Sequence, residues 1–432
     1  MARILFTVWP LTGHIHPNLA IAHEVAALGH QVAFYTGTKF QKQVEAEGFG
    51  HFAPEKVNQT RVEELLLSPQ GIQGATGKPL RLRARWRECV LDSVPGQLED
   101  LNRLLDAWHP DVIVCDPTMW GPFLVLHEAR RIPVAIFSLI PACHLSGSPP
   151  SKAQGPVVGF SMPRPRSAWQ RRKLRTARAV ASFFLRGIHQ RANEIRSQAG
   201  LPPITTSVTD HAGTMPLYLV PSSPEFDYNR TDLPPSVHYV GPCLLKGGEE
   251  ALPEWIEKLP RDEPLIYASE GTVHLEPKVL RAVAQGLADR RVQVIMTTGK
   301  HRDPASIDFG IKPLPPNIHV SQWVPLNPLL PRLSGMVTIG GPSTMMAALE
   351  LGIPVVIVPF AWDHPETGWR VQESGAGVHL RPPECTPENM RRAVEKILKE
   401  PSFRENAQRL AETFRRCGGA PAAARLIAKL AG

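Results

Sequence analysis

A chain of 432 residues, 43 % of them apolar, is long enough for two or three domains with ordinary hydrophobic cores. The net charge of +8 favours anionic partners, but the basic residues are scattered and form no continuous stripe, so we expect no nucleic-acid partner. No apolar run approaches the roughly 18–20 residues that a spanning helix needs, so the sequence excludes the usual helical membrane proteins.

The six cysteines are far apart and include no CxxC pair or Cys/His cluster, which predicts reduced thiols and no metal site. After Met1, the chain passes at Ala2 directly into an apolar strand pattern, with no signal peptide in front of it. We therefore expect a cytoplasmic protein. The composition leaves a monomer and a homodimer equally open.

Short apolar runs alternate with helical patterns along the whole chain, which is typical of parallel sheets covered by helices. In the first half we expect strands at 2–9, 31–37, 111–116, 133–138 and 217–222, and helices at 17–28, 39–47, 98–108, 120–130 and 168–199. In the second half we expect strands at 265–269, 293–299, 318–323, 335–340 and 353–360, and helices at 278–288, 342–351, 369–374, 387–399 and 402–431.

This order of elements predicts the α/β class, with two doubly wound domains that face each other across a cleft. The segment between the halves is rich in Gly, Pro and charge, as interdomain linkers are. We therefore assign residues 1–240 to an N-terminal domain, 241–264 to the linker and 265–410 to a C-terminal domain. The last helix, 411–432, is expected to cross back to the first domain.

The first strand leads into a turn, Thr12 to Pro17, that offers an imidazole where a dinucleotide-binding fold would have several glycines. His14 lies where the strand hands over to a helix, and a neutral imidazole there can accept a proton from a hydroxyl. Asp116 closes another strand and would emerge at the same edge of the sheet, where it would orient the imidazole. The alternatives are a helix-capping or loop histidine and an ordinary strand-end aspartate.

A second strand–turn–helix, residues 337–352, has two glycines followed by Pro342, Ser343 and Thr344. A helix N-terminus carries unpaired N–H donors and about half a positive charge, so this turn predicts an anion site, above all for phosphate.

These motifs, together with SEGT at 269–272, WVP from residue 323 and WDHPETGWRV from residue 362, resemble the two-domain nucleotide-sugar-dependent glycosyltransferases of the GT-B type. The resemblance points to the bacterial branch that glycosylates macrolides, flavonoids and carotenoids. It implies Rossmann-like domains and inverting, metal-independent transfer of a hexose from a UDP- or dTDP-sugar to a hydroxyl of a lipophilic small molecule. The nucleotide sugar is then a co-substrate, and no further cofactor is expected.

The resemblance also implies roles for individual residues. His14 would be the general base and Asp116 its orienting carboxylate. Among the donor-binding positions, Trp323 would stack on the base and Val324 would contact the base edge with its backbone. Two loops would bind the diphosphate, one with Ser269, Gly271 and Thr272 and the other with Ile339, Gly341, Ser343 and Thr344. Asp363 and His364 would bind the sugar hydroxyls.

Four residues depart from the pattern of that family. Ile339 occupies the position of a histidine that usually binds a phosphate, and Ala347 occupies the position of an acid that usually hydrogen-bonds the ribose hydroxyls. Leu326 occupies the position of a customary glutamine. Glu270 puts a carboxylate into the phosphate loop, so it would either point away or bond a sugar hydroxyl. Glu350, one turn after Ala347, is a candidate substitute for the ribose contact or simply a solvated helix residue.

These departures leave two alternative functions open. The protein could be a non-catalytic homologue that binds an acceptor or a partner, or it could be a nucleotide-sugar epimerase or hydrolase. Two basic stretches, 81–89 and 164–186, are either solvated helix faces or a lid with peripheral membrane contact.

Overall fold

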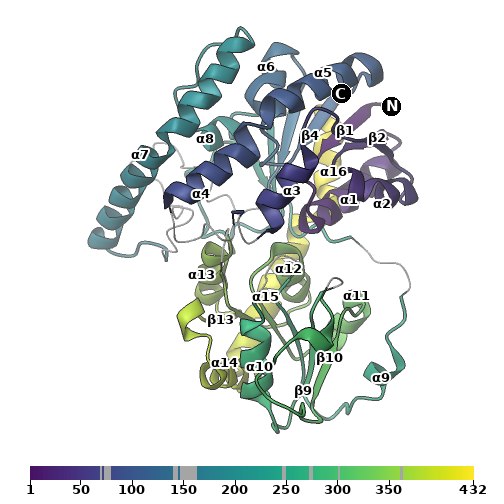
Figure 1. Cartoon of the computed structure of the whole chain (residues 1–432), viewed down its shortest axis with the longest axis vertical. Coiled ribbons are helices and arrows are strands. Elements are labelled where there is room, and N and C mark those ends of the chain that lie inside the picture. The colour runs from purple at the N-terminus through teal and green to yellow at the C-terminus, as the bar shows by residue number, and fades with distance from the viewer. Residues whose placement is uncertain are drawn as a thin grey trace. The chain divides into compact units, whose positions relative to one another are not determined.

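The computed structural model describes residues 1–68, 71–72, 79–139, 145, 163–245, 250–271, 276–299, 302–360 and 363–432. They form two compact units (Figure 1). The first unit takes in most of the chain up to Leu245 and resumes at Cys417–Gly432, and the second takes in Lys246–Arg416.

The first unit is built on a parallel sheet with the strand order β3-β2-β1-β4-β5-β6-β7. Its inner strands β1, β2, β4, β5 and β6 are mostly apolar and almost fully buried, as parallel strands are, whereas the edge strands β3 and β7 are partly exposed. Their bounds are β1 Arg3–Thr7, β2 Gln31–Tyr35, β3 Gly50–Phe52, β4 Val112–Cys115, β5 Val134–Phe137, β6 Leu217–Val220 and β7 Val237–Tyr239.

Helices cover the faces of this sheet. They are α1 Thr12–Ala27, η1 Thr38–Phe40, α2 Gln41–Ala46, α3 Gln59–Leu67, α4 Pro79–Trp86, η3 Arg87–Leu91, α5 Val94–Trp108, η4 Pro122–Leu126, α6 His127–Ala129, α7 Ala168–Gln198, α8 Val208–Ala212 and α16 Gly419–Leu430. The last of these comes from the far end of the chain, contacts α1, and adds Ala423, Ala424 and Ile427 to the core beneath β1.

The second unit repeats the design with the strand order β10-β9-β8-β11-β12-β13. The strands are β8 Leu265–Ser269, β9 Gln293–Thr297, β10 Ile318–Ser321, β11 Gly335–Thr338, β12 Val355–Ile357 and β13 Gly377–His379. The helices are α9 Glu254–Glu257, α10 Lys278–Leu287, η7 Pro304–Ser306, α11 Leu326–Leu329, η8 Leu330–Arg332, α12 Pro342–Glu350, α13 His364–Ser374, η9 Pro382–Glu384, α14 Pro387–Lys399 and α15 Pro401–Cys417.

Both strand orders follow the doubly wound pattern, in which the first strand of the unit lies at the centre and the chain winds outward in both directions. This confirms the predicted class of two Rossmann-like α/β units. In such sheets the topological switch point lies between the first and fourth strands, here β1/β4 and β8/β11, and ligands bind at the carboxyl ends of these strands.

Some element boundaries differ from the sequence prediction. Helix α1 begins at Thr12 rather than at 17, because Pro17 lies inside the helix instead of opening it. The single helix expected at 402–431 is two helices, separated at Gly418, whose φ of +89° stops α15. The segment predicted as linker contains α9, whose Trp255 ring lies 5.6 Å from that of His319 on β10. Within the described residues no helix is long and apolar enough to cross a membrane.

Candidate active site

The switch point of the first unit brings His14 and Asp116 together. β1 and β4 are neighbouring parallel strands with Thr7 opposite Cys115, so both strands end at the same edge of the sheet. His14 follows β1 and lies in the first turn of α1, whereas Asp116 directly follows β4.

The two side chains are hydrogen-bonded. His14 Nδ1 lies 2.5 Å from Asp116 Oδ2, and Asp116 is fully buried. The other carboxylate oxygen accepts hydrogen bonds from the backbone N–H and the hydroxyl of Thr118, at 2.9 and 2.6 Å. Asn18, also fully buried, donates to the backbone carbonyl of His14 at 2.9 Å and fixes the helix turn that carries the imidazole.

Sequence analysis did not single out Thr118 and Asn18, although each carried a local signal. A Thr two residues after an Asp is the spacing of a side-chain-to-backbone turn, and an Asn four residues after the histidine lies on the same helix face. Together they hold both partners of the pair in fixed orientations.

This geometry determines what the histidine can do chemically. The carboxylate binds the proton on Nδ1, which leaves the lone pair of the neutral ring on Nε2. It also stabilises the imidazolium that forms when Nε2 takes up a proton. The pair is therefore suited to general-base catalysis on a hydroxyl group.

An apolar pocket opens at the same sheet edge, after the ends of β1 and β2. Its walls include Trp9, Tyr35, Val57, Val62 and Met119. Met119 follows Asp116 by three residues, so the pocket and the His14–Asp116 pair share the loop after β4.

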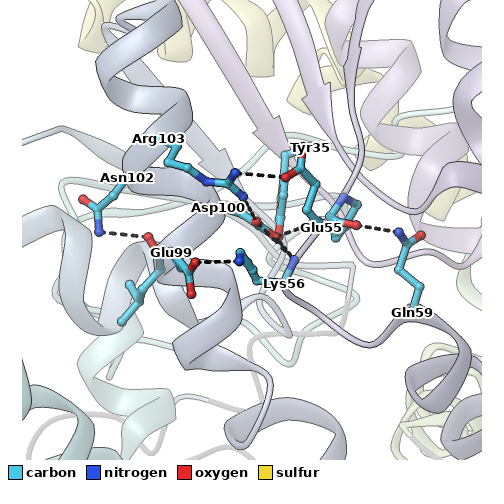
Figure 2. Close-up of polar contacts among 10 residues, drawn as sticks. Tyr35, Glu55, Lys56, Gln59, Glu99, Asp100, Asn102 and Arg103 are labelled. Carbon is cyan, nitrogen blue, oxygen red and sulfur yellow. Dashed lines mark hydrogen bonds and ion pairs between the residues drawn. The ribbon is translucent and has the colours of Figure 1, made fainter.

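A buried polar network supports one wall of this pocket, and Figure 2 shows its members. Asp100 of α5 accepts hydrogen bonds from the Tyr35 hydroxyl at 3.1 Å and from the backbone N–H groups of Glu55 and Lys56 at 2.9 and 3.0 Å. Arg103 bonds both Asp100 and Glu55. Burial, and then the Asp100 carboxylate, raise the pKa of Tyr35, which therefore stays protonated and donates.

We expect Asp100→Ala to lower the free energy of unfolding of the first unit by about 2–3 kcal/mol, because it leaves a buried hydroxyl and two backbone donors without an acceptor. Chemical denaturation is the measurement. Asp106→Ala on the same helix is the control, since its side chain is 67 % exposed and pairs with surface Arg130. Equal losses in the two variants would contradict a structural role for the network.

The second unit has a candidate site of its own at its switch point. The Ser269–Gly271 segment follows β8, and Gly340 and Gly341 follow β11 and lead into α12. Gly340 has a φ of +94°, and a Cβ there would lie 3.2 Å from Ile357, so glycine is needed. A Cβ on Gly341 would meet open space, and Ser343 and Thr344 lie partly exposed in the first turn of α12.

Two of the departures from the family pattern are buried. Ile339 is 7 % exposed, belongs to the core of the second unit, and packs 3.5 Å from where a Cβ on Gly271 would lie. Ala347 is 6 % exposed on α12. Neither side chain can hydrogen-bond a ligand, whereas Glu350 lies partly exposed at the end of the same helix.

Glu270 turns away from the loop it belongs to. Its Oε1 accepts hydrogen bonds from the backbone N–H groups of Val279 and Leu280, at 2.6 and 3.2 Å, so it caps the N-terminus of α10. The side chain is 1 % exposed, and Arg302 lies 3.7 Å from its second oxygen. Burial raises the pKa of this carboxyl to about 7.

The remaining predicted donor residues lie around the same sheet edge. Trp323, after β10, is 44 % exposed, and its carbonyl accepts from Ser321 at 3.0 Å; Val324 is buried. Asp363 precedes α13 and is buried, and His364, the first residue of the helix, is half-buried. Within the described residues the buried atoms Asp363 Oδ2 and His364 Nδ1 have no hydrogen-bond partner. Thr272 lies outside the described residues.

Buried polar atoms of this kind are rare in folded proteins and mark places where a ligand can supply the missing partner. Burial lowers the pKa of His364, so its ring is neutral and can both donate and accept. Among the described side chains there is no group of three or more that could hold a metal ion.

Comparisons with known proteins identify the family of this chain. Residues 285–428 match the family model "Erythromycin biosynthesis protein CIII-like, C-terminal domain". The chain is 32 % identical over 427 residues to 4'-demethylrebeccamycin synthase of Lentzea aerocolonigenes, covering 96 % of both proteins. It is 27 % identical over 435 residues to demethyllactenocin mycarosyltransferase of Streptomyces fradiae, covering 99 % of this chain and 86 % of that protein.

Solved structures share the fold. The glycosyltransferase of kitacinnamycin superposes with a TM-score of 0.78 at 20 % identity, over 100 % of this chain and 99 % of the other. Spinosyn rhamnosyltransferase SpnG, in complex with thymidine diphosphate, has a TM-score of 0.70 at 20 % identity, over 99 % of this chain and 100 % of the other.

The chain therefore belongs to the GT-B glycosyltransferases, in the branch that transfers sugars to small-molecule natural products.

Proposed function

We propose that this glycosyltransferase moves a hexose from a UDP- or dTDP-sugar to a hydroxyl group of a lipophilic small molecule, with inversion at the anomeric carbon. The observation that carries the proposal is the bond between His14 and Asp116 at the switch point of the first unit. Nε2 of His14 removes the proton from the acceptor hydroxyl, and the oxygen attacks the anomeric carbon from the side opposite the leaving nucleoside diphosphate.

The second unit holds the donor in this proposal. Trp323 stacks on the pyrimidine, and Val324 contacts the edge of the base. The α12 N-terminus at Gly341, Ser343 and Thr344 accepts the diphosphate, helped by the loop from Ser269, and its partial positive charge stabilises the leaving group without a metal. Asp363 and His364 bond the sugar hydroxyls through the buried atoms described above.

The named relatives, a rebeccamycin synthase and a mycarosyltransferase, support a lipophilic small molecule as the acceptor. The complex of the spinosyn enzyme with thymidine diphosphate supports a dTDP-sugar as one donor. The five described cysteines are free thiols, in keeping with the proposed cytoplasmic location.

The test is a screen of UDP- and dTDP-hexoses against a macrolide and flavonoid panel, with products identified by mass spectrometry. A glycoside of opposite anomeric configuration to the donor supports the proposal. Free sugar or an epimer from donor alone, with no glycoside, would identify a hydrolase or epimerase instead. Failure to bind UDP or dTDP up to millimolar concentration would point to a non-catalytic homologue.

Trp323→Ala should weaken the binding of UDP and dTDP by about five- to a hundred-fold, because stacking of a base on an aromatic ring is worth roughly 1–3 kcal/mol. Isothermal titration calorimetry measures the effect. Trp255→Ala is the matched control, since Trp255 is another exposed tryptophan of the second unit, at 37 %, and lies on α9. Unchanged affinity in the Trp323 variant would remove this residue from the donor site.

A further inference from the structure

One surface of the first unit carries none of the residues that are assigned above to sugar transfer. Helix α7 is 31 residues long and begins with a capping box in which Ser167 and Gln170 bond each other's backbone. It carries eight Lys and Arg residues against a single acid, Glu194, near its C-terminus. Figure 1 shows it at the outer edge of the first unit.

The solvent side of α7 carries large apolar side chains. Trp169 is 69 % exposed, Phe183 63 % and Val180 41 %. At 3.6 residues per turn these three fall within about 60° of one another and span about 21 Å along the helix. The buried residues Leu174, Ala177 and Ile188 occupy a different side of the helix, so the exposed stripe is not part of the core.

Basic side chains share the exposed surface with this stripe: Arg172 and Lys173 lie directly beside it, whereas Arg171 lies about 160° from Trp169 around the helix. The basic side chains that are exposed on the first two-thirds of α7 are Arg171, Arg172, Lys173, Arg175 and Arg186. Lys173 lies over the Trp169 ring and Arg186 over the Phe183 ring, at 5.6 and 5.4 Å from the centroids. Among the described residues no carboxylate pairs with these five cations, whereas Arg191 and Arg196 nearer the C-terminus do form ion pairs.

We propose that this face of α7, defined by Trp169, Val180, Phe183 and the cations Arg172, Lys173, Arg175 and Arg186, docks on the surface of an anionic phospholipid bilayer. Exposed aromatic and aliphatic side chains on one helix side, with Lys and Arg around them, are the composition of interfacial helices. The aromatic rings insert among the headgroups and the cations bind lipid phosphates, with their aliphatic stems along the apolar boundary.

The positive charge of this face favours an anionic bilayer over a second copy of the chain as its binding partner. A second copy of the chain would place four cations against four more, which like-charge repulsion opposes. A bilayer with anionic headgroups offers both the negative charge and the apolar layer that the rings need. A docked enzyme meets a bilayer-dissolved acceptor at the surface; that consequence, unlike the docking, rests on the proposed acceptor class.

Vesicle co-sedimentation of the full-length protein tests the proposal without any substrate. We expect binding to vesicles containing about one-third phosphatidylglycerol, little binding to phosphatidylcholine alone, and release in about 1 M salt, where the screening length falls to roughly 3 Å. R172E/R175E should bind at least twenty-fold more weakly, since each cation near an anionic surface is worth about five-fold. W169S/F183S should lose about ten-fold through the apolar contact alone.

The matched control is R409E/R415E, the same charge change at two exposed positions of α15, which should bind as the wild type does. Circular dichroism checks that each variant keeps its helices. Absence of wild-type binding to anionic vesicles, or equal binding of the α7 and control variants, would overturn the proposal. If the α7 substitutions instead converted a dimer to a monomer in light scattering, the face would be a self-association surface and the membrane assignment would be wrong.

Discussion

His14→Ala is expected to lower the turnover number by about 10²- to 10⁴-fold while the affinity for the nucleotide sugar stays unchanged. General-base catalysis by a positioned histidine contributes an effect of that size. The donor-binding residues proposed above all belong to the second unit, so loss of an imidazole from α1 removes proton transfer without removing donor contacts. Single-turnover kinetics with saturating donor, together with calorimetric titration of the nucleotide, separates the two effects.

Asp116→Asn extends the same prediction. The amide cannot accept from Nδ1 in the way the carboxylate does, so the ring loses its fixed tautomer and the imidazolium loses its stabilising charge. We expect a loss of turnover comparable to that of the histidine variant. Combining both substitutions should add little, because the two residues act as one unit.

His23→Ala provides the matched control for His14. It removes a histidine from the same helix, where Nε2 bonds the surface residue Glu47 at 2.7 Å, and turnover should not change. Wild-type turnover in the His14 variant would show that another group accepts the proton, and the proposed mechanism would then fail.

Glu270→Gln is expected to change how the stability of the second unit depends on pH. The folded pKa of about 7 lies above the value of 4.5 for an exposed carboxyl. Below pH 4.5 the carboxyl is protonated in both the folded and the unfolded chain, so its burial as an acid does not make the stability depend on pH. Between pH 4.5 and 7 the unfolded chain has lost its proton while the folded chain retains it, so stability falls as the pH rises.

The difference of about 2.5 units between the two pKa values corresponds to about 3 kcal/mol in the free energy of unfolding. The wild type loses this amount between pH 4.5 and 7, and the loss stays constant above pH 7. The glutamine keeps an oxygen for the Val279 and Leu280 N–H groups but does not titrate. Relative to the wild type, the variant should therefore gain about 3 kcal/mol on going from pH 4.5 to pH 8. Hydrogen exchange of the α10 amides, measured across this range in moderate urea, reports on the second unit alone.

Glu276→Gln serves as the control, because this glutamate is exposed close to the start of the same helix and its replacement should leave the pH profile as in the wild type. Identical profiles for the wild type and the Glu270 variant would mean that the Glu270 carboxyl titrates in the folded protein as it does in the unfolded chain.

The fold class followed from the sequence because periodic patterns are local. Most strands that were found contain a run of three or more apolar residues, and the basic helix predicted at 168–199 matches α7, Ala168–Gln198, almost to the residue. The strands that were missed, β3, β7 and β13, have three residues each and contain Gly or His. Such segments become strands only because a neighbouring strand supplies hydrogen bonds, which no local pattern encodes.

The proximity of His14 and Asp116 could be predicted because two strand ends of one parallel sheet meet at one edge. The position of the Glu270 side chain could not. The sequence offered two alternatives, an acid that points away or one that bonds a sugar hydroxyl, and the choice depends on where the N-terminus of α10 lies. That helix end is nearby only in the folded unit, so the cap is a tertiary contact.

The unit that holds His14 is completed by the last residues of the chain. Gly418 ends α15 with its left-handed backbone, Gly419 N–H bonds the Val240 carbonyl at 2.6 Å, and α16 then covers α1. On a ribosome that adds roughly 5–20 residues per second, the 187 residues after Leu245 take about ten to forty seconds to synthesise. During that time the core that α16 seals stays open, so the nascent first unit depends on the second being translated before it can close.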